Sequence, residues 1–259
     1  MIATTAVTIA SGALVGFSLG LVGGGGSILA TPLLLYVVGV AQPHVAIGTS
    51  ALAVAVNALV NFAAHARAGN VRWLCAGVFA VIGTVGAVLG SSVGKSFDGD
   101  RLLLLFALLM VVVGALMLRP RREVADDGRP VGLATCAFTG VLALLAGMTS
   151  GFFGVGGGFL IVPALLLATR MPMIQAIGSS LLAVAAFGAA TASNYALSGL
   201  IDWRIAGEFI AGGIAGGVLG MMAATRLARR KSLLNRIFAI MIFVVAGYVG
   251  YRSLAALTG

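Results

Sequence analysis

The chain contains, near its beginning, the stretch Gly20-Leu-Val-Gly-Gly-Gly-Gly-Ser-Ile-Leu-Ala-Thr-Pro32, in which four glycines and a proline interrupt an apolar run. A second copy, Gly151-Phe-Phe-Gly-Val-Gly-Gly-Gly-Phe-Leu-Ile-Val-Pro163, follows at an offset of 131 residues. Adjacent glycines remove the local preference for one backbone conformation, and a proline suits the first turn of a new helix. We therefore predict a glycine-rich broken or re-entrant helix hairpin in each copy.

The composition around these stretches is that of a membrane protein. Of the 259 residues, 60% are hydrophobic and 9% are charged, whereas a soluble domain carries about 25% charged residues. The mean hydropathy of +1.12 also excludes a disordered chain. Ten apolar stretches, most about long enough to cross a hydrocarbon core of roughly 30 Å, lie near residues 7–22, 28–38, 45–64, 73–93, 102–118, 131–150, 159–169, 174–197, 205–225 and 234–251. No basic segment precedes the first stretch, so we interpret it as a retained helix. The sequence predicts an all-α integral membrane protein.

The second half of the chain repeats the first. Ala46-Ile-Gly-Thr-Ser50 matches Ala176-Ile-Gly-Ser-Ser180 at an offset of 130 residues, and further glycines match at 130 or 131. We predict that residues 1–118 form a first membrane repeat, that residues 119–130 form a charged linker, and that residues 131–259 form a second membrane repeat. Each repeat holds about five hydrophobic segments.

The basic residues indicate how the repeats are oriented. Five crossings per repeat make the repeats inverted and divide the 16 Lys and Arg 12 to 4 across the membrane. A glycine cluster inside one continuous span would make the repeats parallel and divide them 8 to 8. Lys and Arg concentrate in cytoplasmic loops, so we predict two inverted repeats, a cytoplasmic linker at 119–130 and both termini outside. The net charge of +9 then reflects orientation in the cytoplasmic (inner) membrane, and no nucleic acid partner is expected.

The two glycine clusters form the candidate site for a small anion. Irregular backbone at membrane depth must be buried in protein or line a watery cavity. N–H groups at a helix break bind oxyanions without formal charge, and in inverted-repeat transporters such breaks meet near the bilayer centre. No charged residue falls in the middle of a predicted span, which suits an anion held by neutral donors. The alternative is that these glycines only allow helices to pack closely.

Polar side chains extend this candidate site. Hydroxyl pairs begin the segment after each glycine cluster, and they either donate to the same anion or bond to carbonyls of their own helix. Asparagine carboxamides avoid lipid, so they serve as ligand contacts or as bonds between helices. His65, near a helix end, is expected to snorkel toward the interface. The predicted substrate-binding residues are Gly23, Gly25, Gly26, Ser27, Thr49, Ser50, Asn57, Asn61, Gly154, Gly156, Gly157, Gly158, Ser179, Ser180 and Asn194.

The sequence does not indicate an enzyme. The two His and two Cys do not cluster at metal-ligand spacing, and no nucleophile-elbow or zinc-protease motif is present. The glycines at 154–158 follow no strand, unlike those of a dinucleotide loop. We predict no catalytic activity, no metal and no cofactor.

The paired G-x-G-G-G-x-x-x-x-P and A-x-G-[ST]-S motifs resemble those of the TauE/SafE family of sulfite exporters and sulfonate permeases. The resemblance covers nearly the whole chain and implies a secondary transporter that moves small anions such as sulfite, sulfonates or sulfoacetate. Where the repeats differ, Asn57 and Asn61 of the first match Phe187 and Thr191 of the second, so we expect an asymmetric site. Two alternatives stay open at this point: an anion channel, and a membrane scaffold or assembly protein with no transported solute.

Overall fold

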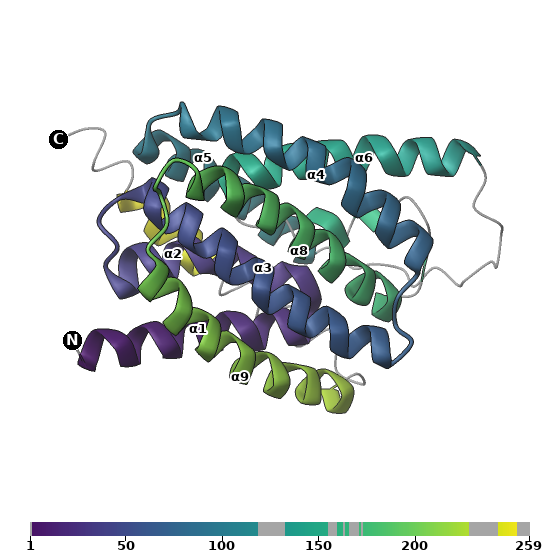
Figure 1. Ribbon diagram of the computed structural model, residues 1–259, viewed down its shortest axis with the longest axis horizontal. Helices are drawn as coiled ribbons and strands as arrows, with labels where there is room; N and C mark the ends of the chain where they lie inside the picture. The colour runs from purple at the N-terminus through teal and green to yellow at the C-terminus, as the bar shows by residue number, and fades with distance from the viewer. Residues whose placement is uncertain are drawn as a thin grey trace.

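The structure is a computed structural model that describes residues 2–118, 133–154, 160–162, 164–165, 171, 173–227 and 243–252. These residues form helices joined by short turns, and none of them lies in a strand. The elements are α1 (Ile2–Val22), η1 (Gly23–Leu29), α2 (Ala30–Leu33), η2 (Leu34–Val38), α3 (Pro43–Arg67), α4 (Trp73–Lys95), α5 (Gly99–Leu118), α6 (Leu133–Phe153), α8 (Met173–Ala196) and α9 (Trp203–Leu227). Figure 1 shows the long helices lying along the long axis of one bundle.

Five of the described helices are long and apolar enough to cross a membrane. The spans are Thr4–Leu21, Pro43–Arg67, Trp73–Lys95, Ile174–Ala196 and Trp203–Ala223. Large apolar side chains also face outward along them, as Val81 does at 70% exposure, and lipid is the solvent that tolerates such a surface. The prediction of an all-α integral membrane protein is confirmed, and the chain is a multi-pass membrane protein.

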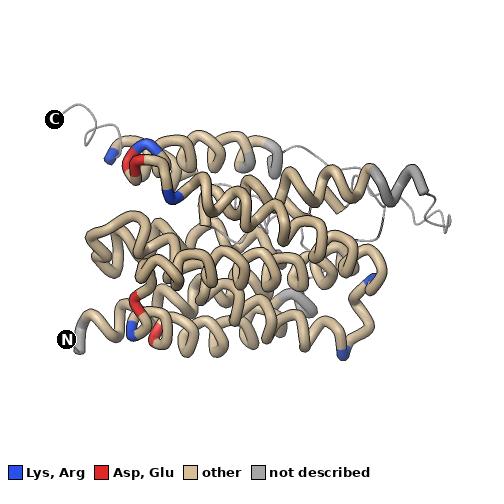
Figure 2. The backbone as a smooth tube through the Cα atoms, turned by 45° about the horizontal axis from the view of Figure 1, so that its top comes forward, with Lys and Arg blue, Asp and Glu red and all other residues tan. Residues whose placement is uncertain are grey.

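Among the described residues, Lys, Arg, Asp and Glu lie at the two ends of the bundle, and the length between the ends carries none of them (Figure 2). At one end, where α1 begins, Thr5 Oγ1 donates a hydrogen bond to Glu208 (3.0 Å), which also pairs with Arg204 (3.2 Å). At the other end, Arg67 and Arg72 lie on either side of the turn between α3 and α4. We call these the Glu208 end and the Arg72 end. The uncharged length between them suits the hydrocarbon core of a bilayer.

The first glycine cluster breaks the chain at the end of α1. Gly23 has a φ of 75° and ends the α-helix, a conformation that costs glycine nothing and strains other residues. The next residues form a fully buried 3-10 helix, η1, followed by the short helix α2, with Pro32 in its first turn, and the π-helical η2. All three pieces contact α1, so the segment runs back along α1 and reaches α3 at the end where α1 began (Figure 1).

Helices from the two halves of the sequence pack against each other. The most extensive contacts join α1 to α9, α4 to α6, and α3 to α8. At the first crossing Gly16 faces the backbone of Gly213, and at the second Gly147 faces the backbone of Gly83. The four residues are related by the same offsets, 131 and 130, that relate the sequence repeats. Small residues at these crossings allow the close backbone approach that holds helices together in lipid.

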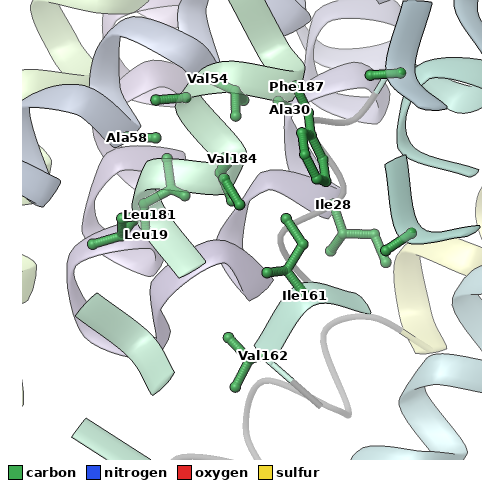
Figure 3. Packing of buried hydrophobic residues seen from close by; sticks show 14 of the residues in the cluster. Leu19, Ile28, Ala30, Val54, Ala58, Ile161, Val162, Leu181, Val184 and Phe187 are labelled. Carbon is green, nitrogen blue, oxygen red and sulfur yellow. The ribbon is translucent and has the colours of Figure 1, made fainter. Parts of the chain in front are cut away.

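The interior where the halves meet is filled with apolar side chains. Leu19 of α1, Ile28 of η1, Val54 of α3, and Val184 and Phe187 of α8 are almost completely buried in one cluster. Figure 3 shows these side chains together with Ile161 and Val162, which occupy the same interior. The broken segment therefore packs directly against α8 of the other half.

Candidate functional site

The first hydroxyl pair lies near the start of α3, in contact with residues of the second half. Thr49 Oγ1 accepts a hydrogen bond from the backbone N–H of Asp202 (3.0 Å). Ser50 Oγ donates to the carbonyl of Ile47 (2.9 Å) and lies 3.5 Å from the carbonyl oxygen of Gly154. Gly154 has a φ of 65°, and Ile47 packs against it. We call residues 47–50, Gly154 and Asp202 the α3 cluster, and it lies beside the α8–α9 turn, at the Glu208 end.

The second hydroxyl pair lies near the start of α8 and repeats this arrangement at the Arg72 end. Ser179 Oγ accepts a hydrogen bond from the backbone N–H of Arg72 (3.0 Å). Ser180 Oγ donates to the carbonyl of Ile177 (2.8 Å). The side chain of Ile177 packs against Gly23, where the Cγ2 atom lies 2.9 Å from the position of an added Cβ. We call residues 177–180, Gly23 and Arg72 the α8 cluster.

Each cluster thus joins a hydroxyl pair from one half of the chain to a glycine break and a turn from the other half. In the α3 cluster the hydroxyl of the first half holds the α8–α9 turn of the second, and in the α8 cluster the reverse is true. The glycine before each hydroxyl makes this possible, because Gly48 packs on the carbonyl of Leu200 and Gly178 on the carbonyl of Asn70. A Cβ at either glycine would push the turn away. The Ala-Ile-Gly-[ST]-Ser motif is therefore a docking surface for a turn from the other half.

The α3 cluster continues into the first glycine segment through hydroxyl groups. Thr31 Oγ1 of α2 lies 2.8 Å from Ser50 Oγ, and Ser27 Oγ donates to the carbonyl of Gly24 (2.8 Å). Gly25 and Gly26 lie between Gly24 and Ser27 in η1 and are buried, and Gly26 packs on the α1 backbone. The hydroxyls of Thr49 and Ser179 act as acceptors here, and each also carries a proton for donation to a ligand. Thr31 was missed in the sequence analysis, although its place beside Pro32 in the break is a usable signal.

The three asparagines do not join the hydroxyl pairs. Asn57 is fully buried with its carboxamide against Gly213 of α9, and Asn61 packs beside Gly217 while donating from Nδ2 to the Asn57 carbonyl (2.9 Å). Asn194 lies at the Glu208 end, where its Oδ1 accepts from Lys95 Nζ (2.7 Å) and its Nδ2 donates to Ser91 and Ser92 of α4. The first two face the α9 helix, and the third connects the ends of α4 and α8.

Part of the predicted site falls outside the described residues, namely Gly156, Gly157 and Gly158. In the part of the chain that the structure does describe, no three His, Cys, Asp or Glu residues come close enough to hold a metal ion. His65 departs from the expectation that it would reach the interface, because its side chain is 2% exposed. The geometry is thus one of neutral hydroxyls, carbonyls and amides at two helix breaks.

Comparison with known proteins agrees with this geometry. The sequence model of the family described as "Sulfite exporter TauE/SafE" matches residues 8–249. The chain belongs to the TauE/SafE family. A "Probable membrane transporter protein" of Xylella fastidiosa strain Temecula1 is 62% identical over 97% of this chain and 97% of its own length. The "Probable membrane transporter protein YunE" of Bacillus subtilis is 28% identical over 90% of this chain and 93% of its own. No solved structure matches. This TauE/SafE member is therefore a membrane transporter and not an enzyme.

Proposed function

We propose that the protein is a secondary transporter that exports a small oxyanion, such as sulfite, a sulfonate or sulfoacetate, across the cytoplasmic membrane. The observation that carries the proposal is the pair of equivalent clusters, each built from neutral donors at a positive-φ glycine and lying at opposite ends of the bundle. Oxyanions bind well to hydroxyls and backbone N–H groups at a helix break. The family description, which names a sulfite exporter, supports the class of solute, and the names of the relatives support a membrane transporter.

The reciprocal hydrogen bonds also support alternating access. Thr49 holds the α8–α9 turn at one end, and Ser179 holds the α3–α4 turn at the other. A hydrogen bond of this kind contributes only about 1 kcal/mol net, so either turn is released at low cost. Release of one cluster while the other stays closed exposes the interior to one side at a time, which is the requirement of a carrier. The filled interior around Phe187 favours a carrier over an anion channel.

The proposal is tested by ligand-dependent stability and flux. The purified full-length chain is heated with sulfite, thiosulfate, sulfoacetate or acetate, against chloride at equal ionic strength. We expect at least one sulfur oxyanion to raise the melting temperature, because a ligand at 100 times its Kd contributes about 2.7 kcal/mol. The same anion should show saturable flux in proteoliposomes. If none of these anions stabilises the protein and none is transported, the proposal is wrong and the scaffold hypothesis replaces it.

We further propose that the halves are inverted repeats around these clusters, with residues 1–118 and 131–259 as the repeats and both termini outside. Support comes from the reciprocal helix pairs and from the 12 to 4 division of basic residues. Fluorescent-protein and alkaline-phosphatase fusions at the C-terminus measure the orientation. We expect phosphatase activity and no fluorescence; a fluorescent, phosphatase-negative fusion would contradict the inverted arrangement. The cytoplasmic arginines would then concentrate anions at the inner mouth, as export requires.

A further inference from the structure

A polar stripe runs along one face of α3 toward the Arg72 end. Asn57, Asn61 and His65 follow one another at four-residue spacing, which places them on one side of the helix. Their exposed fractions are 0%, 3% and 2%. The carboxamide of Asn57 and both ring nitrogens of His65 have no hydrogen-bond partner among the described residues. An unpartnered buried polar group costs about 1–3 kcal/mol, so a ligand that forms hydrogen bonds with these groups would bind favourably here.

His65 lies next to the turn that closes the α8 cluster. The backbone N–H of Asn70 donates to the His65 carbonyl (3.0 Å), and the Asn70 carbonyl packs on Gly178. Two residues further on, Arg72 donates from its backbone N–H to Ser179. A movement that releases this turn from Ser179 therefore also acts on the hydrogen bond that joins the turn to the backbone of His65.

The equivalent position at the other end holds a tyrosine. Tyr195 is fully buried, its carbonyl accepts from the N–H of Leu200 (3.0 Å), and its hydroxyl has no partner among the described residues. The two positions thus share their backbone bonding and burial and differ in chemistry. A phenol keeps its proton through the physiological range, whereas an imidazole gains or loses one. Of these two equivalent positions, the one occupied by His65 carries a group that changes its charge near neutral pH.

Among the described residues, the elements packed around His65 carry no carboxylate at the Arg72 end. α1 carries no ionisable side chain, α8 carries none at this end, and the ionisable side chains described on α9 are Arg204 and Glu208 at the opposite end. The titratable and charged groups described near the α3–α4 turn are Arg67, Arg72 and Cys75, which is buried in the first turn of α4. An anion that enters here is the counter-charge that a protonated His65 lacks.

We propose that His65 is a proton-linked anion-recognition residue at the Arg72 end, which binds a proton as the oxyanion arrives and donates a hydrogen bond to it. This inference rests on the proposed transport of an oxyanion and names a residue that binds the oxyanion at the Arg72 end. The imidazole takes one proton from water, and the resulting cation pairs with the anion, so the loaded end gains no net charge. A neutral pair costs far less than a lone anion in a water-poor site. Anion binding is therefore stronger at low pH.

The test uses methanesulfonate, whose charge is constant between pH 5 and pH 8, on the full-length wild-type chain. NMR of labelled imidazole follows both histidines, and His44→Gln assigns the two signals. We expect methanesulfonate to move the titration midpoint of His65 to higher pH and to leave that of His44 unchanged. If one proton binds with each anion, the affinity for methanesulfonate falls by up to about tenfold for each pH unit above the titration midpoint of His65 in the anion-free protein. The melting temperature measures that affinity.

The variant His65→Tyr places at this position the residue found at Tyr195, and His65→Gln is a second, smaller replacement. Both should bind methanesulfonate weakly and with a flat pH dependence, while His44→Gln should behave as the wild type does. Unchanged pH dependence in the His65 variants, or a His65 signal that ignores the anion, would overturn the inference and leave anion transport standing. Failure of the wild type to bind any of the tested anions at any pH would overturn the proposed function itself.

Discussion

Gly23→Val is expected to abolish transport, with a loss of at least about a hundredfold, in a protein that still inserts into the membrane. Gly23 has a φ of 75°, and a β-branched residue is strained there by about 1–3 kcal/mol. In addition, the new Cβ would lie 2.9 Å from Cγ2 of Ile177, in the middle of the α8 cluster. Strain and contact both displace the α8 cluster on which alternating access depends, and a hundredfold loss of rate requires about 2.7 kcal/mol. Flux of the anion that stabilises the wild type is the measurement.

Gly39→Val is the matched control for this prediction. Gly39, between η2 and α3 and outside both clusters, also has a positive φ, 87°, yet an added Cβ there meets nothing within 4 Å. We expect Gly39→Val to lose some thermal stability and to keep most of its flux. A second control combines Gly23→Val with Ile177→Ala, which removes the contact and should restore part of the flux. If Gly39→Val is as inactive as Gly23→Val, backbone strain alone explains the loss and the α8 cluster has no special role.

The sequence repeat predicted much of this arrangement and missed its spatial order. Matching glycines at offsets of 130 and 131 indicated equivalent helix breaks, and Gly23 and Gly154 do share a left-handed φ. The pattern suggested one central site, because transporters with such breaks often have one. In the structure Thr49 and Ser179 lie near opposite ends, since each binds a turn of the other half. Contacts between halves leave no periodicity in the sequence, so residue order alone does not reveal them.

The polar side chains of α3 were also only partly predictable. A carboxamide in an apolar span avoids lipid, so the sequence shows that Asn57 and Asn61 face other helices. The sequence does not show which helix each of them faces. The answer depends on glycines of α9, because Gly213 and Gly217 leave the space that the two carboxamides fill. His65 was expected at the interface on account of its place near a helix end. Its side chain is buried, and the turn after α3 folds back so that the N–H of Asn70 bonds to the His65 carbonyl.

Gly213→Leu is expected to prevent the protein from folding, which is the largest effect on stability that the structure predicts. Gly213 lies where three helices meet, with its backbone against Gly16 of α1 and its Cα against the carboxamide of Asn57 on α3. An added Cβ at Gly213 falls on the carboxamide of the fully buried Asn57, so a Leu there drives α3 and α9 apart. Overpacking in a well-filled core costs about 1–3 kcal/mol and occasionally more, and in lipid no hydrophobic effect between helices offsets it. Loss of the monodisperse peak in size-exclusion chromatography measures the outcome.

Two comparisons show whether this effect belongs to the repeat. Gly207→Leu on the same helix should be nearly harmless, because an added Cβ at Gly207 meets nothing within 4 Å. Gly83→Leu changes the equivalent residue of the first half. The backbone of Gly83 lies against Gly147, and an added Cβ there meets Phe187, whereas at Gly213 it meets Asn57. We expect Gly83→Leu to be as damaging as Gly213→Leu, because the α4–α6 and α1–α9 crossings make similarly extensive contacts between the two halves. A folded, stable Gly83→Leu variant would mean that the crossings are not equivalent, and that α4 and α6 tolerate separation where α1 and α9 do not.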